Sequence, residues 1–188
     1  MVTKGELTRR IKNACRSVCE IEEELTDDDS FSGNADLGLE MVKICKAIER
    51  ASEESADGIK ELLDDAAMAV MVLDGGSAVS LWYSWLEALE KAAPDYEEMS
   101  EEELKNMFAR ALQEIGSRPE AEQGGGEMVD VLTSATSAVV STSGSASELF
   151  RVAAAAAENS RRLSSSARGG VSDAGAAGAA RFFAGLAK

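Results

Sequence analysis

The sequence predicts an all-α protein that forms a single domain over residues 1–188. Apolar residues recur every three or four positions along most of the chain, which is the spacing of one face of an α-helix. Only two prolines interrupt these patterns, and no segment reads as a convincing strand. A chain of this length can bury one sizeable core. We therefore expect a globular protein built from helices and loops.

Three helices are predicted in the first part of the chain. The first runs from about Lys4 to Leu25, and an acidic loop from Asp27 to Gly38 follows it. Apolar residues at helical spacing predict the second and third helices around residues 41–48 and 59–73. The stripe that defines the first helix consists of Leu7, Ile11, Ala14, Val18, Ile21 and Leu25.

Five further helices are predicted in the rest of the chain. The fourth follows the turn at Asp74–Ser77, and we expect its Trp82 and Trp85 to pack in the core. The fifth begins after Ser100, because Ser100 and Glu103 form a capping-box signature. Glycines lower the predicted stability of the last helix. The remaining three are expected around residues 128–139, 149–157 and 174–188, with the serine run at residues 164–166 as a flexible connection.

The charge balance narrows the classes of partner. Nineteen basic and 34 acidic residues give a formal net charge of −15, which repels nucleic acids and anionic membrane surfaces. No apolar run approaches the roughly 18 to 20 residues that a membrane span needs. Residues 1–6 lack the apolar core of a signal peptide. We therefore expect a cytoplasmic protein that binds neither nucleic acid nor membranes.

The three cysteines are predicted to be reduced thiols in the core. Cys15, Cys19 and Cys45 are odd in number and lie within helical apolar patterns. A zinc site is not expected, because the chain has no histidine and no CxxC pair.

Three loops combine glycine with polar residues just before a predicted helix. They span Asp27 to Gly38, Asp74 to Ser80 and Gly124 to Asp130. A helix start presents free backbone N–H groups, so each loop can in principle hold an anion. Glycine before a helix is more often a simple turn, however, and no loop is specific by itself.

The order of these loops resembles that of the nucleotide-binding L subunit, or C-terminal domain, of dihydroxyacetone kinases. The resemblance implies an antiparallel eight-helix barrel. In that family, a D-x-x-x-x-D-x-D-H-G loop holds two magnesium ions that bridge the phosphates of ATP. The corresponding residues here read DSFSGNADLG. Asp29 and Asp36 match the outer aspartates, whereas Asn34 replaces the middle carboxylate and Leu37 replaces the histidine.

The second family motif, close to G-G-[AS]-S-G-x-L-[FY], cups phosphate with a serine and a small glycine. The resemblance places Gly75, Gly76 and Ser77 in this motif. Ala78 and Val79 stand where the hydroxyl and the glycine belong, and a valine there crowds a close phosphate approach.

The third family motif, G-D-K-T-M-x-D, appears here as GGGEMVD. Met128 and Asp130 remain, but Gly126 and Glu127 replace the lysine and the threonine. Near the chain end Asp173 matches a family aspartate, while the segment that covers the nucleotide is largely absent. Phosphoryl transfer depends on metal ions and fixed positive groups, so these losses argue against kinase activity.

The leading functional hypothesis is a divergent relative that has lost ATP-dependent kinase activity. Such a protein would bind or convert a small, rather apolar metabolite in the barrel mouth, by an acid–base, cyclisation or isomerisation step of a biosynthetic pathway. The candidate catalytic residues are Asp29, Asp36, Asp130 and Asp173. The candidate ligand-binding residues are Asn34, Leu37, Gly75, Gly76, Ser77, Ala78, Val79, Tyr83 and Met128.

Two alternatives remain open. One is a phosphoryl-donor subunit that binds Mg-ATP or Mg-ADP, with Asp29 and Asp36 as metal ligands. The other is a non-catalytic binding or regulatory relative. The leading hypothesis expects no cofactor, whereas retained family activity requires magnesium and ATP or ADP. Besides a small-molecule ligand, the possible partners are a second copy of the chain or a kinase-like subunit.

Overall fold

The computed structural model describes residues 1–32, 36–117, 127–167, 169–171 and 173–188, apart from the side chains of Asp29, Phe31 and Ser32. Nearly all of this part of the chain is helical, as predicted. The helices are α1 (Lys4–Cys19), α2 (Glu22–Ser32), α3 (Leu37–Glu54), α4 (Ile59–Met71), α5 (Ser77–Lys91), α6 (Glu101–Gly116), α8 (Glu127–Ser141), α9 (Ala146–Ala167) and α10 (Ala174–Leu186).

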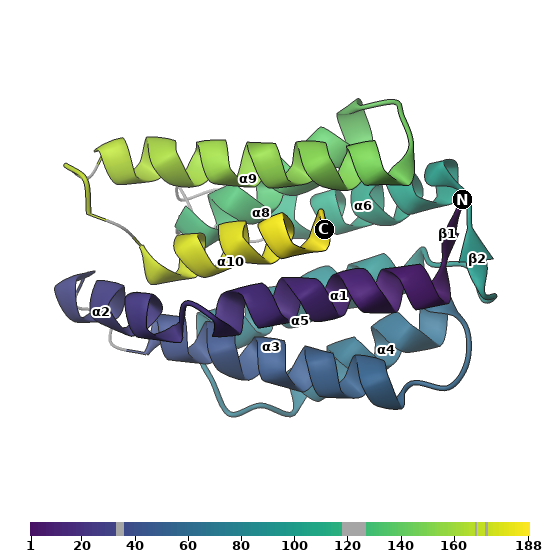
Figure 1. Ribbon diagram of the computed structural model, residues 1–188, viewed down its shortest axis with the longest axis horizontal. Helices are drawn as coiled ribbons and strands as arrows, with labels where there is room; N and C mark the ends of the chain where they lie inside the picture. The colour runs from purple at the N-terminus through teal and green to yellow at the C-terminus, as the bar shows by residue number, and fades with distance from the viewer. Residues whose placement is uncertain (33–35, 118–126, 168, 172) are drawn as a thin grey trace.

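Eight of these helices close into an antiparallel barrel, which confirms the predicted fold (Figure 1). Each helix packs on the next in the order α1, α3, α4, α5, α6, α8, α9 and α10, and α10 packs back on α1 to complete the ring. The short helix α2 extends beyond one end. At the opposite end, β1 (Val2–Thr3) pairs with β2 (Glu98–Met99) in a small antiparallel ladder that the sequence analysis did not predict.

The first predicted helix is wrong in its extent. Helix α1 ends at Cys19, and α2 begins at Glu22 and carries Asp27, Asp28 and Asp29, which were expected to lie in a loop. The glutamates in the first turn of α2 suit the positive end of a helix. The turn also lets Leu25 pack against Gly38 of α3, where a Cβ atom on the glycine would lie 2.7 Å from the Cβ of Leu25.

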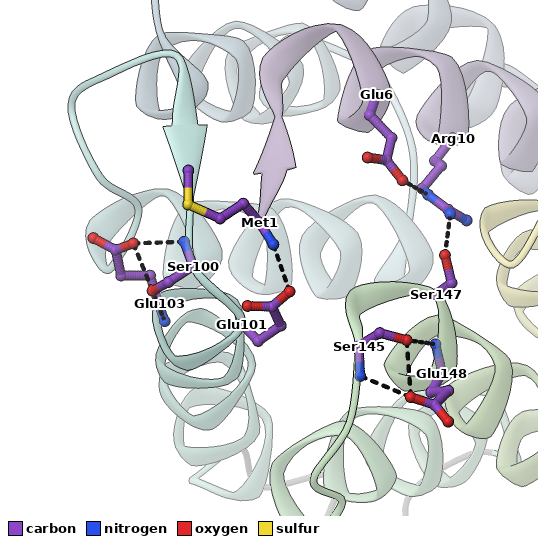
Figure 2. A network of polar contacts seen from close by, with 9 residues as sticks. All are labelled: Met1, Glu6, Arg10, Ser100, Glu101, Glu103, Ser145, Ser147 and Glu148. Atoms are coloured by element: carbon purple, nitrogen blue, oxygen red, sulfur yellow. Dashed lines mark hydrogen bonds and ion pairs between the residues drawn. The ribbon is translucent and has the colours of Figure 1, made fainter.

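The ends of α6 and α9 test two further predictions. The predicted capping box is confirmed, with Ser100 and Glu103 each accepting from the other's backbone N–H (Figure 2). Ser145 and Glu148 make the same pair of contacts before α9, a signature that the sequence analysis overlooked. Helix α9 continues to Ala167, so the serine run at residues 164–166 is helical and the predicted flexible connection there is wrong.

A buried arginine joins three helices near the β1–β2 end of the barrel. Arg10 is only 4% exposed, and its side chain donates to Glu6 at 3.0 Å and to Ser147 at 3.0 Å (Figure 2). It also donates to the Leu186 carbonyl at 3.1 Å. Its guanidinium also lies over the ring of Phe150. Because these contacts come from α1 itself, from α9 and from α10, Arg10 holds the ends of the three helices together.

Small residues allow α10 to lie very close to its neighbours. Trp82 and Trp85 are buried as predicted and stack edge-on with Phe182 of α10. On the side facing α1, Gly185 meets the α1 backbone so closely that an added Cβ atom would lie 2.5 Å from the Cα of Ala14. The glycines that weaken α10 as an isolated helix are therefore required by its packing.

No helix within the described residues is both long enough and apolar enough to cross a membrane.

We predict that Gly185→Ala destabilises the barrel by about 1 to 3 kcal/mol, because the added methyl group collides with main-chain atoms that cannot rotate away. Urea denaturation followed by circular dichroism measures this loss. Gly5→Ala is the matched control, since a Cβ atom at Gly5 meets nothing within 4 Å and alanine favours helix. Equal effects of the two substitutions would contradict the packing argument.

Replacing Arg10 by methionine keeps most of the apolar stem and removes every donor. We expect Arg10→Met to lower the free energy of unfolding by about 1 to 3 kcal/mol, because the Leu186 carbonyl loses its buried partner. Arg9→Met, at an exposed position one residue earlier, should change stability by no more than about 0.5 kcal/mol. A loss in Arg9→Met as large as in Arg10→Met would show that burial of the guanidinium is not decisive.

Candidate functional site at the loop end of the barrel

Helices α3, α5, α8 and α10 all begin at the same end of the antiparallel barrel, away from β1 and β2 (Figure 1). We call this the loop end. It brings together four groups of residues that the sequence analysis selected separately: Asp36, the Gly75–Ser77 turn, Asp130 and Asp173. The side chain of Asp29 and the whole of Asn34 lie outside the described residues, so their predicted roles stay predictions.

A carboxylate from α3 occupies the glycine turn that precedes α5. The Gly76 N–H donates to Oε1 of Glu40 at 2.7 Å. Gly76 is the N-cap of α5, so Glu40 lies at the positive end of the helix dipole, where the related motif is expected to hold phosphate. The carboxylate also leaves little room for a side chain at position 76, because an added Cβ atom on Gly76 would lie 3.1 Å from the same oxygen.

Glu40 belongs to none of the motifs that predicted the site. The helix predicted around residues 41–48 begins just after it, and Glu40 lies one turn after Asp36, the N-cap of α3. Only the tertiary contact across 36 positions of sequence gives it a role.

The apolar residues selected at this end are mostly buried. Ala78 is 0% exposed, Val79 is 8% exposed and Met128 is 6% exposed. Val79 also crowds the turn itself, because an added Cβ atom on Gly75 would lie 2.4 Å from Cγ2 of Val79. A glycine at position 79 would leave that space open, so the valine side chain occupies space beside the turn. Its effect on an approaching phosphate stays a prediction.

Leu37 covers the start of α10. A Cβ atom added to Gly175 would lie 2.7 Å from Cδ2 of Leu37 and 3.2 Å from Oδ1 of Asp173. Leu37 is half-buried and packs against the apolar core. This residue therefore packs an apolar side chain beside the Asp173 carboxylate.

The selected aspartates differ in what surrounds them. Asp36 is exposed and adopts a left-handed backbone conformation with φ of 97°, which is strained for a residue other than glycine. Asp130 lies in the first turn of α8 and remains open to solvent, but the protein atoms around it raise the pKa of its carboxyl group by desolvation. Asp173 is buried and caps α10 by accepting from the Ala176 N–H at 2.8 Å.

Tyr83 lies further along α5 than the glycine turn. Its hydroxyl donates to Glu87 one turn later at 2.9 Å, and this hydrogen bond raises the pKa of the phenol. The phenol also interacts with Asp64 of α4, so Tyr83 lies on the side of α5 that faces α4. The candidate ligand-binding role of Tyr83 therefore gains no support from its position.

Among the described residues, no group of three or more His, Cys, Asp or Glu side chains is arranged to hold a metal ion. The side chain of Asp29 and the whole of Asn34, which belong to the predicted metal loop, lie outside these residues. A phosphate group at the α5 N-terminus would have to displace the Glu40 carboxylate and pass Val79. The geometry therefore disfavours phosphate at a turn whose sequence keeps both glycines.

An apolar cavity of ≈ 30 Å³ lies among side chains that include Leu7, Leu89, Leu104, Phe150 and Leu186. These residues belong to the half of the barrel nearer β1 and β2. The cavity has room for about one water molecule, so a metabolite cannot enter it without movement of the core.

Comparison with known proteins identifies the family. The DAK2 domain matches residues 32–188. The chain belongs to the DAK2 domain family. No match was found among curated protein sequences.

Two solved structures have the same fold as this DAK2 domain. The dihydroxyacetone kinase from C. freundii in complex with AMP-PNP and Mg2+ aligns with a TM-score of 0.68 and 20% identity, covering 96% of this chain and 33% of that one. The native form of the C. freundii enzyme aligns with a TM-score of 0.69 and 20% identity, covering 96% and 34%. This chain thus spans about a third of the kinase. At this identity the likeness establishes the barrel alone.

The capping role of Asp173 predicts a simple pattern of stability. Asp173→Ala should lower the free energy of unfolding by about 0.5 to 2 kcal/mol through loss of the N-cap. Asp173→Asn should stay close to wild type, because asparagine also caps helices while carrying no charge. Thermal denaturation of the two variants tests this. A loss in the asparagine variant equal to that in the alanine variant would mean that the charge, and not the cap, matters.

Proposed function

We propose that this DAK2 domain binds or converts a small, rather apolar molecule at the loop end and does not transfer phosphate from ATP. The observation that carries the proposal is the hydrogen bond from the Gly76 N–H to the Glu40 carboxylate. It fills the anion-binding position at the start of α5 with a negative charge from the protein itself. A nucleotide would compete with a group that is already tethered beside the turn.

The charge at the loop end supports the same conclusion. Asp36, Glu40 and Asp130 belong to the helices that begin there, and the acidic helix α2 extends beyond this end. A triphosphate meets repulsion from such a surface, whereas an uncharged molecule does not. Binding of a neutral ligand is therefore favoured over binding of ATP.

Asp130 is the best candidate for acid–base chemistry. Desolvation raises the pKa of its carboxyl group, which moves it toward the range where a carboxyl can both accept and donate a proton. Its side chain is accessible, unlike that of Asp173. In this proposal Asp130 exchanges a proton with the ligand, and Asp36 on the rim is the second candidate.

One observation favours the alternative of a Mg-nucleotide-binding phosphoryl-donor subunit. The fold gathers Asp36, Gly75, Gly76, Asp130 and Asp173 at one end, in the order that the kinase family uses. A partner subunit that supplies the acceptor would then be needed, since this chain spans only about a third of the C. freundii kinase.

Calorimetric titration with ATP and with ADP, each with and without magnesium, separates the two functions. We expect no micromolar, magnesium-dependent binding to the wild-type protein. Glu40→Ala should improve binding of the nucleotide, because it frees the Gly76 N–H and removes one negative charge. Glu102→Gln is the control: it removes one charge from an exposed position at the start of α6, at the opposite end of the barrel. Micromolar, magnesium-dependent binding by the wild type would overturn the proposal in favour of the kinase subunit.

A second measurement separates catalysis from simple binding. For any uncharged metabolite that raises the melting temperature, turnover should be lost in Asp130→Asn while the thermal shift remains. Turnover that survives in Asp130→Asn and in Asp36→Ala would exclude both carboxylates as catalytic groups. A thermal shift with no turnover in the wild type would instead identify a non-catalytic binding protein.

A further inference from the structure

Three exposed apolar side chains lie together where helix α4 ends. Met68 is 45% exposed, Met71 is 44% exposed, and Val72, the C-cap residue, is 74% exposed. Met71 and Val72 follow Met68 by three and four positions, which places all three on one face of the helix. The helix buries its other side against α3 and α5. These three residues, which we call the α4 apolar patch, therefore point away from the core.

Carboxylates continue this face toward the start of α4. Glu61 and Asp64 are exposed, and Asp65 is partly exposed. Asp64 and Asp65 lie three or four positions from both Glu61 and Met68, so the acids and the apolar patch form one strip along the helix. Desolvation raises the pKa of Glu61, and the carboxylates of Asp57 and Asp65 raise it further. The three acids on α4, which we call the α4 acidic patch, therefore form a surface that a cation would stabilise.

The strip has the dimensions of a short helix. It extends about 16 Å from Glu61 to Val72, at a rise of about 1.5 Å per residue. Within the described residues α4 packs mainly on α5 and α3, and the strip itself faces solvent. A partner helix of about three turns matches this length, with apolar contacts at one end and ionic contacts at the other.

We propose that this outer face of α4 binds an amphipathic helix of another protein. The partner sets apolar side chains on the α4 apolar patch and lysine or arginine side chains on the α4 acidic patch. Methionine suits such a contact, because its unbranched and flexible side chain adapts to the shape of an apolar partner. The carboxylates select a basic partner by charge complementarity. The strip lies on the side of the barrel, so this inference does not rest on the function proposed for the loop end.

Charge favours this partner over two others. A second copy of the chain brings a net charge of −15 and, in a symmetric pairing of this face, a second acidic patch, so like charges oppose each other. An anionic membrane surface is repelled for the same reason. A basic amphipathic helix gains from both halves of the strip, whereas the other two gain only from its apolar end.

The test uses a fluorescein-labelled synthetic peptide as the partner. One face of the peptide helix carries leucines in one half and lysines in the other, over about 18 residues, because shorter helices are marginal. Fluorescence anisotropy measures its affinity for the protein. We expect Met68→Gln combined with Met71→Gln to weaken binding at least about tenfold, because two apolar contacts are lost. Leu163→Gln is the matched control on α9: it removes another exposed apolar side chain and should change the affinity less than about twofold.

A second set of measurements tests the acidic patch. Asp64→Asn should weaken binding of the same peptide about threefold and make its affinity less sensitive to salt, because one ionic contact is lost. Glu102→Gln controls for net charge, since it removes an exposed carboxylate at the start of α6. A peptide with glutamates in place of the lysines should not bind. Circular dichroism should show that these surface variants keep the wild-type fold.

Methyl NMR of the protein with isotopically labelled methionine locates the contact. The Met68 and Met71 signals, assigned from the two substitutions made singly, should shift when the peptide is added. The signals of the buried Met41 and Met99 should stay in place.

Three outcomes would overturn the proposal. The first is an equal loss of affinity in the double methionine variant and in Leu163→Gln, or NMR shifts confined to other methionines. The second is a wild-type protein that sediments as a dimer and becomes monomeric in the double variant, because a second copy would then cover the face. The third is binding to phosphatidylcholine vesicles that the double variant loses, which would assign the face to a membrane.

Discussion

The close approach of α10 to its neighbours is the constraint on which the rest of the barrel depends. Gly185 lies against the α1 backbone, and Gly178 and Gly175 receive Met41 and Leu37 of α3. Larger side chains at these positions would push α10 outward and open the ring between α9 and α1. The same contacts place Asp173 beside Leu37, so the packing of α10 also determines the shape of the loop end.

The two ends of the barrel differ in which charged groups they contain and in what binds those groups. Near β1 and β2, the buried guanidinium of Arg10 donates to Glu6, Ser147 and the Leu186 carbonyl, and it stabilises the fold. At the loop end, a carboxylate is bound by a backbone N–H, and other carboxylates lie on the surrounding helix starts. Helix starts attract anions through their dipoles. In this protein of net charge −15, its own acidic residues already lie at the helix starts of the loop end.

Sequence patterns predicted the helices well where periodicity and caps agreed. The box at Ser100 located α6, and apolar spacing located most of the others. The break between α1 and α2 could not be seen, because Ile21 and Leu25 continue the apolar stripe in phase and only the contact with Gly38 shows the turn. The same contrast applies to the site. The order of the motifs selected Asp36, Asp130 and Asp173, which lie at one end of the barrel. The role of Glu40 depends on a tertiary contact that no local sequence pattern contains.

Membership of the DAK2 family fixes the barrel and leaves the chemistry to the individual side chains. A helix start is a general anion site, and what it binds depends on which anion is nearest and most concentrated. Glu40 is held on the adjacent helix, so its effective concentration at Gly76 is set by the fold and does not fall when the ligand is dilute. To bind at Gly76, a phosphate from solution must displace the Glu40 carboxylate and overcome the repulsion of the surrounding acidic residues. A neutral ligand faces neither cost, and this difference supports the proposal that the loop end binds an uncharged molecule.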